Sequence, residues 1–135
     1  MINLQYLDHV AIYVEDMERT IAWYETVLFL KKKSVPEWDP YPIFMLTGKT
    51  GIAIFPANMS DPPIDQQSSN VRIEHFAFHV SNTDFQKALE HYNELGLEYT
   101  VKDHTYFHSV YTRDPDGHLV ELTTLVPGQE AFYNI

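Results

Sequence analysis

The sequence predicts an α+β fold made of two βαβββ modules, and three observations carry this prediction. First, residues 7–14 and 73–80 match position by position: apolar, acidic, His, apolar, Ala, apolar, aromatic ring, Val. Second, each of these segments is followed by apolar residues at helical spacing. Third, three short strand candidates follow each expected helix. A repeat that spans about half the chain indicates two similar modules, and it is stronger evidence for the architecture than any single predicted helix or strand.

In the first module, residues 7–14 are rich in β-branched and aromatic residues, which predicts a strand. Apolar residues between Met17 and Leu28 recur near the helical period, so a helix follows. The turn signal Gly48-Lys49-Thr50-Gly51 separates the last two strand candidates. The three strands after this helix are expected at about 29–34, 41–47 and 51–56.

The second module repeats this order. Residues 73–80 form the expected strand, and Ser81-Asn82-Thr83 supplies N-cap chemistry for a helix that Gly96 ends. Asp114-Pro115-Asp116-Gly117 is a strong turn signal between the last two strands. These strands are expected at about 97–102, 106–113 and 117–124.

The predicted organisation is a single domain over residues 1–126, with a C-terminal tail over 127–135. Within the domain, module one covers about 4–56, a polar and proline-bearing linker about 57–70, and module two about 71–126. The tail carries Phe132 and Tyr133, which either cap a neighbouring surface or fray.

Composition excludes several classes of function. The chain has 19 acidic and 9 basic side chains and a formal charge of −10, which repels phosphate backbones and anionic lipid surfaces. Nucleic acid and membranes are therefore not expected as partners. Cysteine is absent, so the protein has neither disulfides nor a thiolate metal site. No apolar run approaches the roughly 18 residues of a membrane span, and a cytoplasmic location is expected.

The candidate metal ligands are His9, His75 and Glu121. The two histidines occupy equivalent positions of the repeated strands, so pseudo-twofold packing of the modules would turn both imidazoles toward one cavity. Glu121 lies among apolar neighbours in the closing strand, where a buried carboxylate needs a partner. Two imidazoles and one carboxylate leave coordination positions open, which suits one divalent Fe, Mn, Zn or Ni ion and direct binding of substrate.

These motifs resemble the vicinal oxygen chelate superfamily, which includes glyoxalase I, fosfomycin-resistance transferases, bleomycin-binding proteins and extradiol ring-cleaving dioxygenases. The resemblance rests on Leu7-Asp8-His9-Val10-Ala11, on Ile21-Ala22-Trp23-Tyr24, on Glu74-His75-Phe76-Ala77-Phe78 and on residues 114–121, and it spans the chain to about Leu125. It implies a U-shaped mixed sheet around a metal held by His9, His75 and Glu121. It also implies a homodimer that in some members builds each site from two chains.

The reaction is predicted only by class: a metal-dependent enzyme that chelates a small-molecule substrate through vicinal oxygens. An extradiol-type dioxygenase or a glyoxalase-like lyase or isomerase is expected, although residues 51–55 lack the acid that glyoxalase I typically adds as a fourth ligand. A fosfomycin-type thiol transferase is an alternative that Ser109 and Tyr111 favour. Ala11 and the absence of Arg or Lys after Glu121 argue against it.

The candidate catalytic residues are Tyr111, His104 and His108. In the resemblance to extradiol dioxygenases, Tyr111 stands ten residues before Glu121, where those enzymes place a Tyr. His104 or His108 would act as the acid or base if the loops bring its imidazole to the metal site. Strand alternation puts His108 on the sheet face opposite Tyr111 unless a bulge intervenes. Two non-enzymatic alternatives stay open. One is a metal-free drug-binding module of the same fold, and the other is a regulatory or interaction domain that uses the fold as a scaffold.

Overall fold

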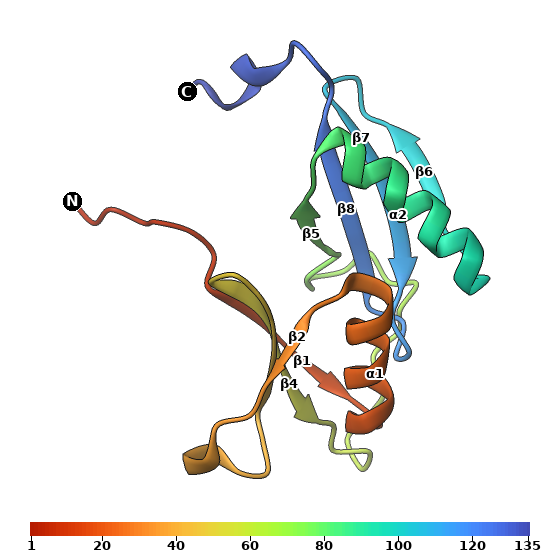
Figure 1. The fold of residues 1–135 in the computed structure, drawn as a ribbon. Helices are drawn as coiled ribbons and strands as arrows, with labels where there is room; N and C mark the ends of the chain where they lie inside the picture. Colours follow the sequence, from red (N-terminus) through yellow and green to blue (C-terminus); the bar gives the residue numbers. More distant parts are fainter. The chain divides into compact units, whose positions relative to one another are not determined.

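The computed structural model describes residues 1–135 as two compact units, Met1–Gln66 and Gln67–Ile135, and each is described by itself. Figure 1 shows the same order of elements in both units: a strand, a helix and three further strands. The predicted α+β class and the repeated βαβββ module are thus confirmed. The boundary between the units falls inside the predicted linker.

Unit 1 contains a four-stranded sheet and the helix α1. Its sheet order is β1-β4-β3-β2, in which β1 is parallel to β4 and the other neighbours are antiparallel. The elements are β1 (His9–Val14), α1 (Met17–Leu28), β2 (Lys31–Lys33), η1 (Pro36–Trp38), β3 (Ile43–Thr47) and β4 (Thr50–Pro56).

Unit 2 repeats this topology with the sheet order β5-β8-β7-β6, and again the first strand of the module is parallel to its last. The helix α2 lies across one face of this sheet (Figure 1). The elements are β5 (Phe76–His79), α2 (Asn82–Leu95), β6 (Thr100–Asp103), β7 (Phe107–Arg113), β8 (Leu119–Leu125) and η2 (Glu130–Tyr133).

Both helices carry a side-chain N-cap, and the one at Ser81 was predicted. The carboxylate of Asp16 accepts the N–H of Arg19 at 3.0 Å, and the hydroxyl of Ser81 accepts the N–H of Asp84 at 3.1 Å. Each cap satisfies a backbone donor that the first helical turn leaves without a partner. Each helix ends at a left-handed residue; Gly96 (φ 67°) does so as predicted, and Phe29 (φ 57°) does so in unit 1.

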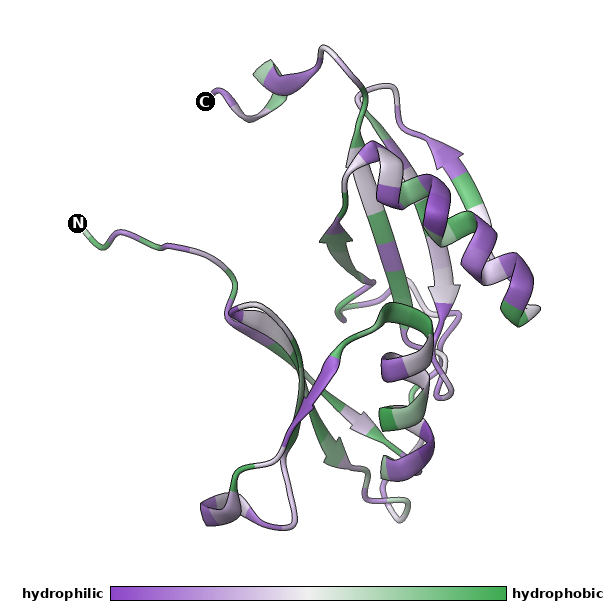
Figure 2. Cartoon of the chain, in the orientation of Figure 1, coloured by the Kyte–Doolittle hydropathy of each residue, from purple (hydrophilic) through white to green (hydrophobic).

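Each unit buries its core between the helix and one face of its sheet. Alternation along the strands places Ile52 and Ile54 in the core of unit 1 beneath Tyr24 of α1, and all three are fully buried. In unit 2 the equivalent core holds Tyr92 of α2 and Val120 of β8. Figure 2 shows the amphipathic pattern of α2, with hydrophobic and hydrophilic stretches alternating along the helix.

Several strand predictions are wrong in their bounds. Residues 7–14 and 73–80 were expected as full strands, yet β1 begins at His9 and β5 begins at Phe76, one residue after His75. The strand expected at 29–34 shrinks to β2, because the left-handed Phe29 still belongs to the end of α1. His75 therefore lies in the segment that leads into the sheet, where pairing constrains its backbone less than in a strand.

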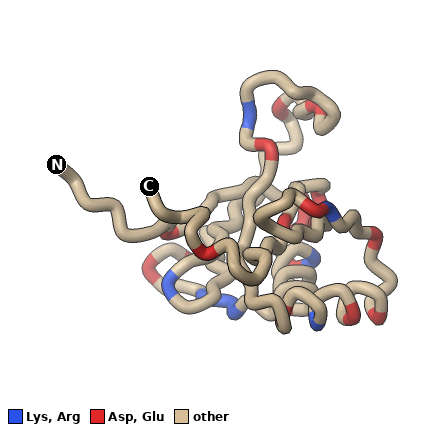
Figure 3. The backbone as a smooth tube through the Cα atoms, turned by 90° about the horizontal axis from the view of Figure 1, so that it is seen from above, with Lys and Arg blue, Asp and Glu red and all other residues tan.

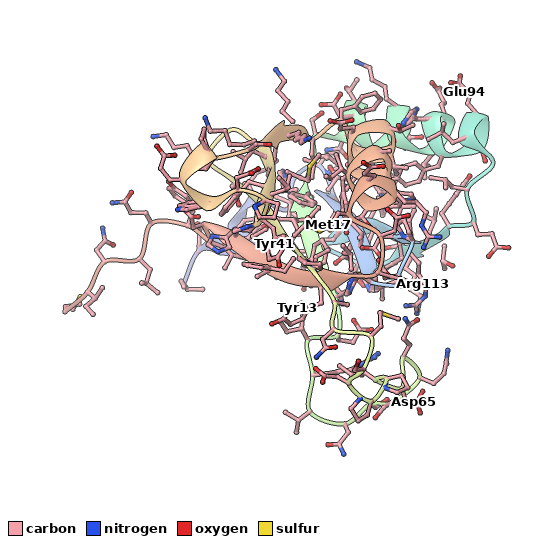
Figure 4. All side chains as sticks on the ribbon, turned by 90° about the horizontal axis from the view of Figure 1, so that it is seen from below. Tyr13, Met17, Tyr41, Asp65, Glu94 and Arg113 are labelled. Atoms are coloured by element: carbon pink, nitrogen blue, oxygen red, sulfur yellow. The ribbon has the colours of Figure 1, made fainter.

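The turn before β8 matches its sequence signal. The carboxylate of Asp114 accepts the N–H groups of Asp116 at 3.0 Å and of His118 at 2.9 Å, and Gly117 has φ 86°. This turn sets the register in which Tyr111 lies opposite Glu121. Figure 3 marks the positions of charged residues along the backbone, and the sequence has 19 acidic residues against 9 basic ones. Neither helix has the length and apolar content needed to cross a membrane.

Candidate functional site

His75 and Glu121 meet on the face of the unit 2 sheet opposite α2. The Nε2 atom of His75 lies 2.9 Å from a carboxylate oxygen of Glu121, and its Nδ1 atom contacts the carboxylate of Glu74. A carboxylate on one ring nitrogen fixes the orientation and tautomer of an imidazole whose other nitrogen binds a metal. The contact with Glu74 therefore orients the His75 ring so that its Nε2 atom faces the carboxylate of Glu121.

Glu121 is the most constrained member of this group. It lies in the middle of β8, is only 7% exposed, and pairs with Ala77 of β5 and Tyr111 of β7. A carboxylate so deeply buried requires a cation or hydrogen-bond donor close by. The neighbouring imidazole of His75 meets that requirement when protonated, and a metal ion would meet it in the same position.

Tyr111 extends the polar face along β7. Its hydroxyl lies 2.9 Å from Nε2 of His104, and its ring stands edge-on to that of His75 with centroids 5.8 Å apart. Burial first, and then the Glu121 carboxylate, raise the pKa of the Tyr111 phenol to about 12. The phenol therefore keeps its proton at neutral pH. Beside it, the hydroxyls of Ser109 and Thr123 are hydrogen-bonded at 3.0 Å.

His9 has the same local design in unit 1 with a different neighbourhood. Its Nδ1 atom lies 2.8 Å from the carboxylate of Asp8, just as Nδ1 of His75 contacts Glu74. Its ring stands edge-on to Phe44, with centroids 5.3 Å apart. Asp8 and Glu74 were not among the predicted site residues. The acid–His pair that recurs in the repeated segments is the sequence signal for both orienting carboxylates.

The remaining candidate, His108, lies elsewhere. It pairs with Thr124 across the β7–β8 ladder, on the face opposite Tyr111, and its Nε2 atom is 3.9 Å from the carboxylate of Asp103. No bulge interrupts β7, so the structure brings His104 to Tyr111 and leaves His108 on the other side of the sheet.

The side chains of unit 2 fit part of a metal-binding set. Neither unit by itself gathers three His, Asp or Glu side chains in a group that could hold a metal ion. Unit 2 supplies one imidazole nitrogen and one carboxylate oxygen at 2.9 Å, a donor pair that suits Zn, Fe, Mn or Ni. This pair by itself is fewer than the three protein ligands typical of a catalytic metal site.

Comparison with known proteins relates most of the chain to one family. The sequence model of the Glyoxalase/Bleomycin resistance protein/Dioxygenase superfamily matches residues 6–122. Metallothiol transferase FosB of Staphylococcus saprophyticus is 28% identical over 124 residues, which cover 90% of this chain and 78% of that protein.

Two solved structures illustrate the likeness in three dimensions. The fosfomycin resistance protein FosX of Mesorhizobium loti has a TM-score of 0.65 and 25% identity, and the match covers 93% of this chain and 96% of that chain. A glyoxalase/dioxygenase of Nostoc punctiforme shares the fold at a TM-score of 0.75 and 23% identity, covering 92% and 93%. The chain belongs to the Glyoxalase/Bleomycin resistance protein/Dioxygenase superfamily, as its repeated motifs predicted.

Proposed function

We propose that this protein is a metal-dependent enzyme that binds a small substrate through two neighbouring oxygen atoms, with His9, His75 and Glu121 as the metal ligands. The contact that carries the proposal is the 2.9 Å approach of His75 Nε2 to the buried carboxylate of Glu121. Family membership supports it, because the superfamily includes enzymes such as the fosfomycin-modifying transferases. His9 is included because its orienting contact with Asp8 repeats that of His75 with Glu74.

A divalent ion held by His9, His75 and Glu121 would supply Lewis-acid stabilisation of negative charge on a substrate oxygen. The chain's own groups then handle the proton. The Tyr111 phenol carries its proton at neutral pH, so its hydroxyl would donate to an oxygen that becomes negative during the reaction. His104, at 2.9 Å from that hydroxyl, returns a proton to Tyr111 or accepts one from it.

The decisive test is elemental analysis of protein purified without chelator. The wild type should contain close to one Fe, Mn, Zn or Ni ion per site, and Glu121→Ala should lose it. Glu94→Ala is the matched control, because Glu94 is an exposed acid near the end of α2. A wild type that binds no metal even after reconstitution would contradict the proposal and leave a metal-free binding module as the better account.

Transfer of a thiol to a small electrophile is the reaction class that the relatives favour. The 28%-identical relative is a metallothiol transferase and the 25%-identical structure is a fosfomycin resistance protein. In such a transfer the thiol loses its proton as the sulfur bonds to a carbon, the bond between that carbon and an oxygen breaks, and the released oxygen takes up a proton. The Tyr111–His104 pair would supply this proton and be restored by the one that the thiol releases.

Substrate assays separate this class from the others that the same site could serve. Fosfomycin with a small thiol, a catechol under oxygen, and a hemithioacetal report transferase, dioxygenase and glyoxalase-like activity respectively. Ala11 and the absence of Lys or Arg after Glu121 weaken the case for a phosphonate substrate, so electrophiles without a phosphonate belong in the panel. In each active assay His75→Ala should abolish turnover, whereas a pure binding module would retain its affinity.

A further inference from the structure

The turn between β6 and β7 has an uncommon backbone conformation directly after His104. The next residue, Thr105, has φ 72°, which a β-branched residue rarely adopts. The N–H of Thr105 donates to the carboxylate of Asp103 at 2.8 Å, and the N–H of His104 donates to the carbonyl of Phe107 at 2.8 Å. Strained residues of this kind persist only where the surroundings over-determine them. The conformation of the turn therefore needs support from outside the turn.

The C-terminal tail, residues 127–135, supplies contacts to this turn. The N–H of Val126 donates to the carbonyl of Tyr106 at 2.9 Å, which fixes the start of the tail beside the turn. The chain then folds back into η2, whose Phe132 ring meets two rings of the turn. It lies edge-on to Phe107 with centroids 4.7 Å apart, and its centroid is 5.7 Å from that of Tyr106. The ring of Tyr133 also stands edge-on to that of Phe107, with centroids 6.1 Å apart.

We propose that the C-terminal tail is a positioning element in which Phe132 holds the β6–β7 turn in the conformation that brings His104 to Tyr111. Phe132 contacts the two residues that follow Thr105, and His104 immediately precedes it. Release of Phe132 frees the left-handed Thr105 to relax, and the imidazole of His104 then leaves the phenol of Tyr111. The catalytic meaning of this contact rests on the proposed function, but the contact itself does not.

The test is nuclear magnetic resonance on the full, metal-free chain. In the wild type, protons of the His104 ring should show cross-relaxation with the Tyr111 ring. In Phe132→Ala this signal should fall to less than half. The amides of His104 and Val126 should exchange with solvent roughly tenfold faster, the size expected for lost aromatic pairs. Ile135→Ala is the matched control, because Ile135 is fully exposed in the same tail and should change neither measurement.

Unchanged cross-relaxation and exchange in Phe132→Ala would overturn the proposal. Phe132→Tyr keeps the ring and should restore the wild-type values. If Phe132→Ala fails to fold, seen as loss of protection in the middle of β7 and β8, Tyr133→Ala decides in its place. Tyr133 is more exposed, at 59%, so the same changes should occur at smaller size, and their absence would overturn the proposal. These measurements need no metal or substrate, so they can be interpreted even if the proposed function is wrong.

Discussion

The two units share one backbone plan but carry different chemistry on the equivalent face. In unit 2, His75 stands edge-on to Tyr111, with ring centroids 5.8 Å apart. In unit 1, His9 stands edge-on to Phe44, with centroids 5.3 Å apart. The geometry is nearly the same, and what differs is the hydroxyl that His104 contacts in unit 2.

The strand registers show a second difference of the same kind. Ala77 of β5 pairs with Glu121 of β8, whereas the equivalent Ala11 of β1 pairs with Ala53 of β4. Ala53 thus occupies in unit 1 the place of the carboxylate in unit 2. Both units orient their histidine through a preceding acid, so this orientation is the shared feature of the repeat. The buried carboxylate and the phenol occur in unit 2 alone, and in unit 1 the imidazole of His9, with its Asp8 partner, lies beside the apolar ring of Phe44.

Tyr111→Phe gives unit 2 the aromatic neighbour of unit 1, and it should have the largest effect. We expect kcat to fall about 10²- to 10⁴-fold, the usual contribution of a positioned proton donor, while metal content stays unchanged. The ring contact with His75 survives in this variant. Steady-state kinetics on the substrate found by the assay panel, with metal analysis, check both parts. The reciprocal Phe44→Tyr should leave kcat close to wild type. If Tyr111→Phe keeps the kcat of the wild type, the phenol of Tyr111 is not the proton donor.

Ala53→Glu installs in unit 1 the carboxylate that unit 2 has. Ala53 is 1% exposed, so an unpaired acid there should lower the free energy of unfolding by about 1–3 kcal/mol without metal. If His9 is a ligand, the new acid lies where a fourth ligand would stand, and added Zn or Ni should raise the melting temperature more than in the wild type.

Ala53→Gln is the matched control for this variant, since it has the same size and no charge. It should show the loss of stability without the enhanced response to metal. If added metal raises the melting temperatures of the two variants equally, position 53 does not lie at the metal-binding site.

Local signals in the sequence were enough for the fold. The repeat, the N-cap at Ser81 and the Gly96 stop depend on residue types and spacing, and the structure contains all three. Strand alternation also placed His108 on the face opposite Tyr111, as observed. Such features follow from backbone geometry within one element, and sequence patterns record that geometry directly.

Longer-range features of the site were not predictable. His104 reaches Tyr111 through a left-handed Thr105, a residue type that gives no hint of that conformation. The support that Phe132 gives to this turn joins segments far apart in the chain, and periodicity carries no information about such contacts. The full ligand set of His9, His75 and Glu121 stays a prediction for the metal analysis to test.

Alkaline pH should weaken unit 2 through Tyr92 of α2. The hydroxyl of Tyr92 is buried beside Thr112 without a hydrogen bond of normal geometry, and burial raises the pKa of the phenol well above its ordinary value. The unfolded phenol ionises near pH 10 and the folded one only at higher pH. Its contribution to stability is therefore complete below about pH 10 and is lost as the pH rises further.

Urea unfolding between pH 8 and 11 tests this expectation. The wild type should lose stability steeply above pH 10, and Tyr92→Phe should decline less. Tyr133→Phe, at a half-exposed position, should follow the wild type. Parallel curves for all three proteins would mean that the alkaline loss has another source.

The helix ends provide the smallest test of the comparison between units. Both helices stop at a left-handed residue, Gly96 in unit 2 and Phe29 in unit 1, and only glycine adopts this conformation without steric cost. Phe29 is 70% exposed, so Phe29→Gly sacrifices little burial and should raise the free energy of unfolding by up to about 1 kcal/mol.

Gly96→Ala is the opposite change and should lower the free energy of unfolding by about 1 kcal/mol. An added Cβ at Gly96 meets no atom within 4 Å, so this cost comes from the backbone conformation alone. Chemical denaturation of both variants measures the two values. If Phe29→Gly is instead destabilising, the Phe29 ring contributes more to unit 1 by packing than its left-handed backbone costs, and the two helix ends are then not equivalent in energy although they share one geometry.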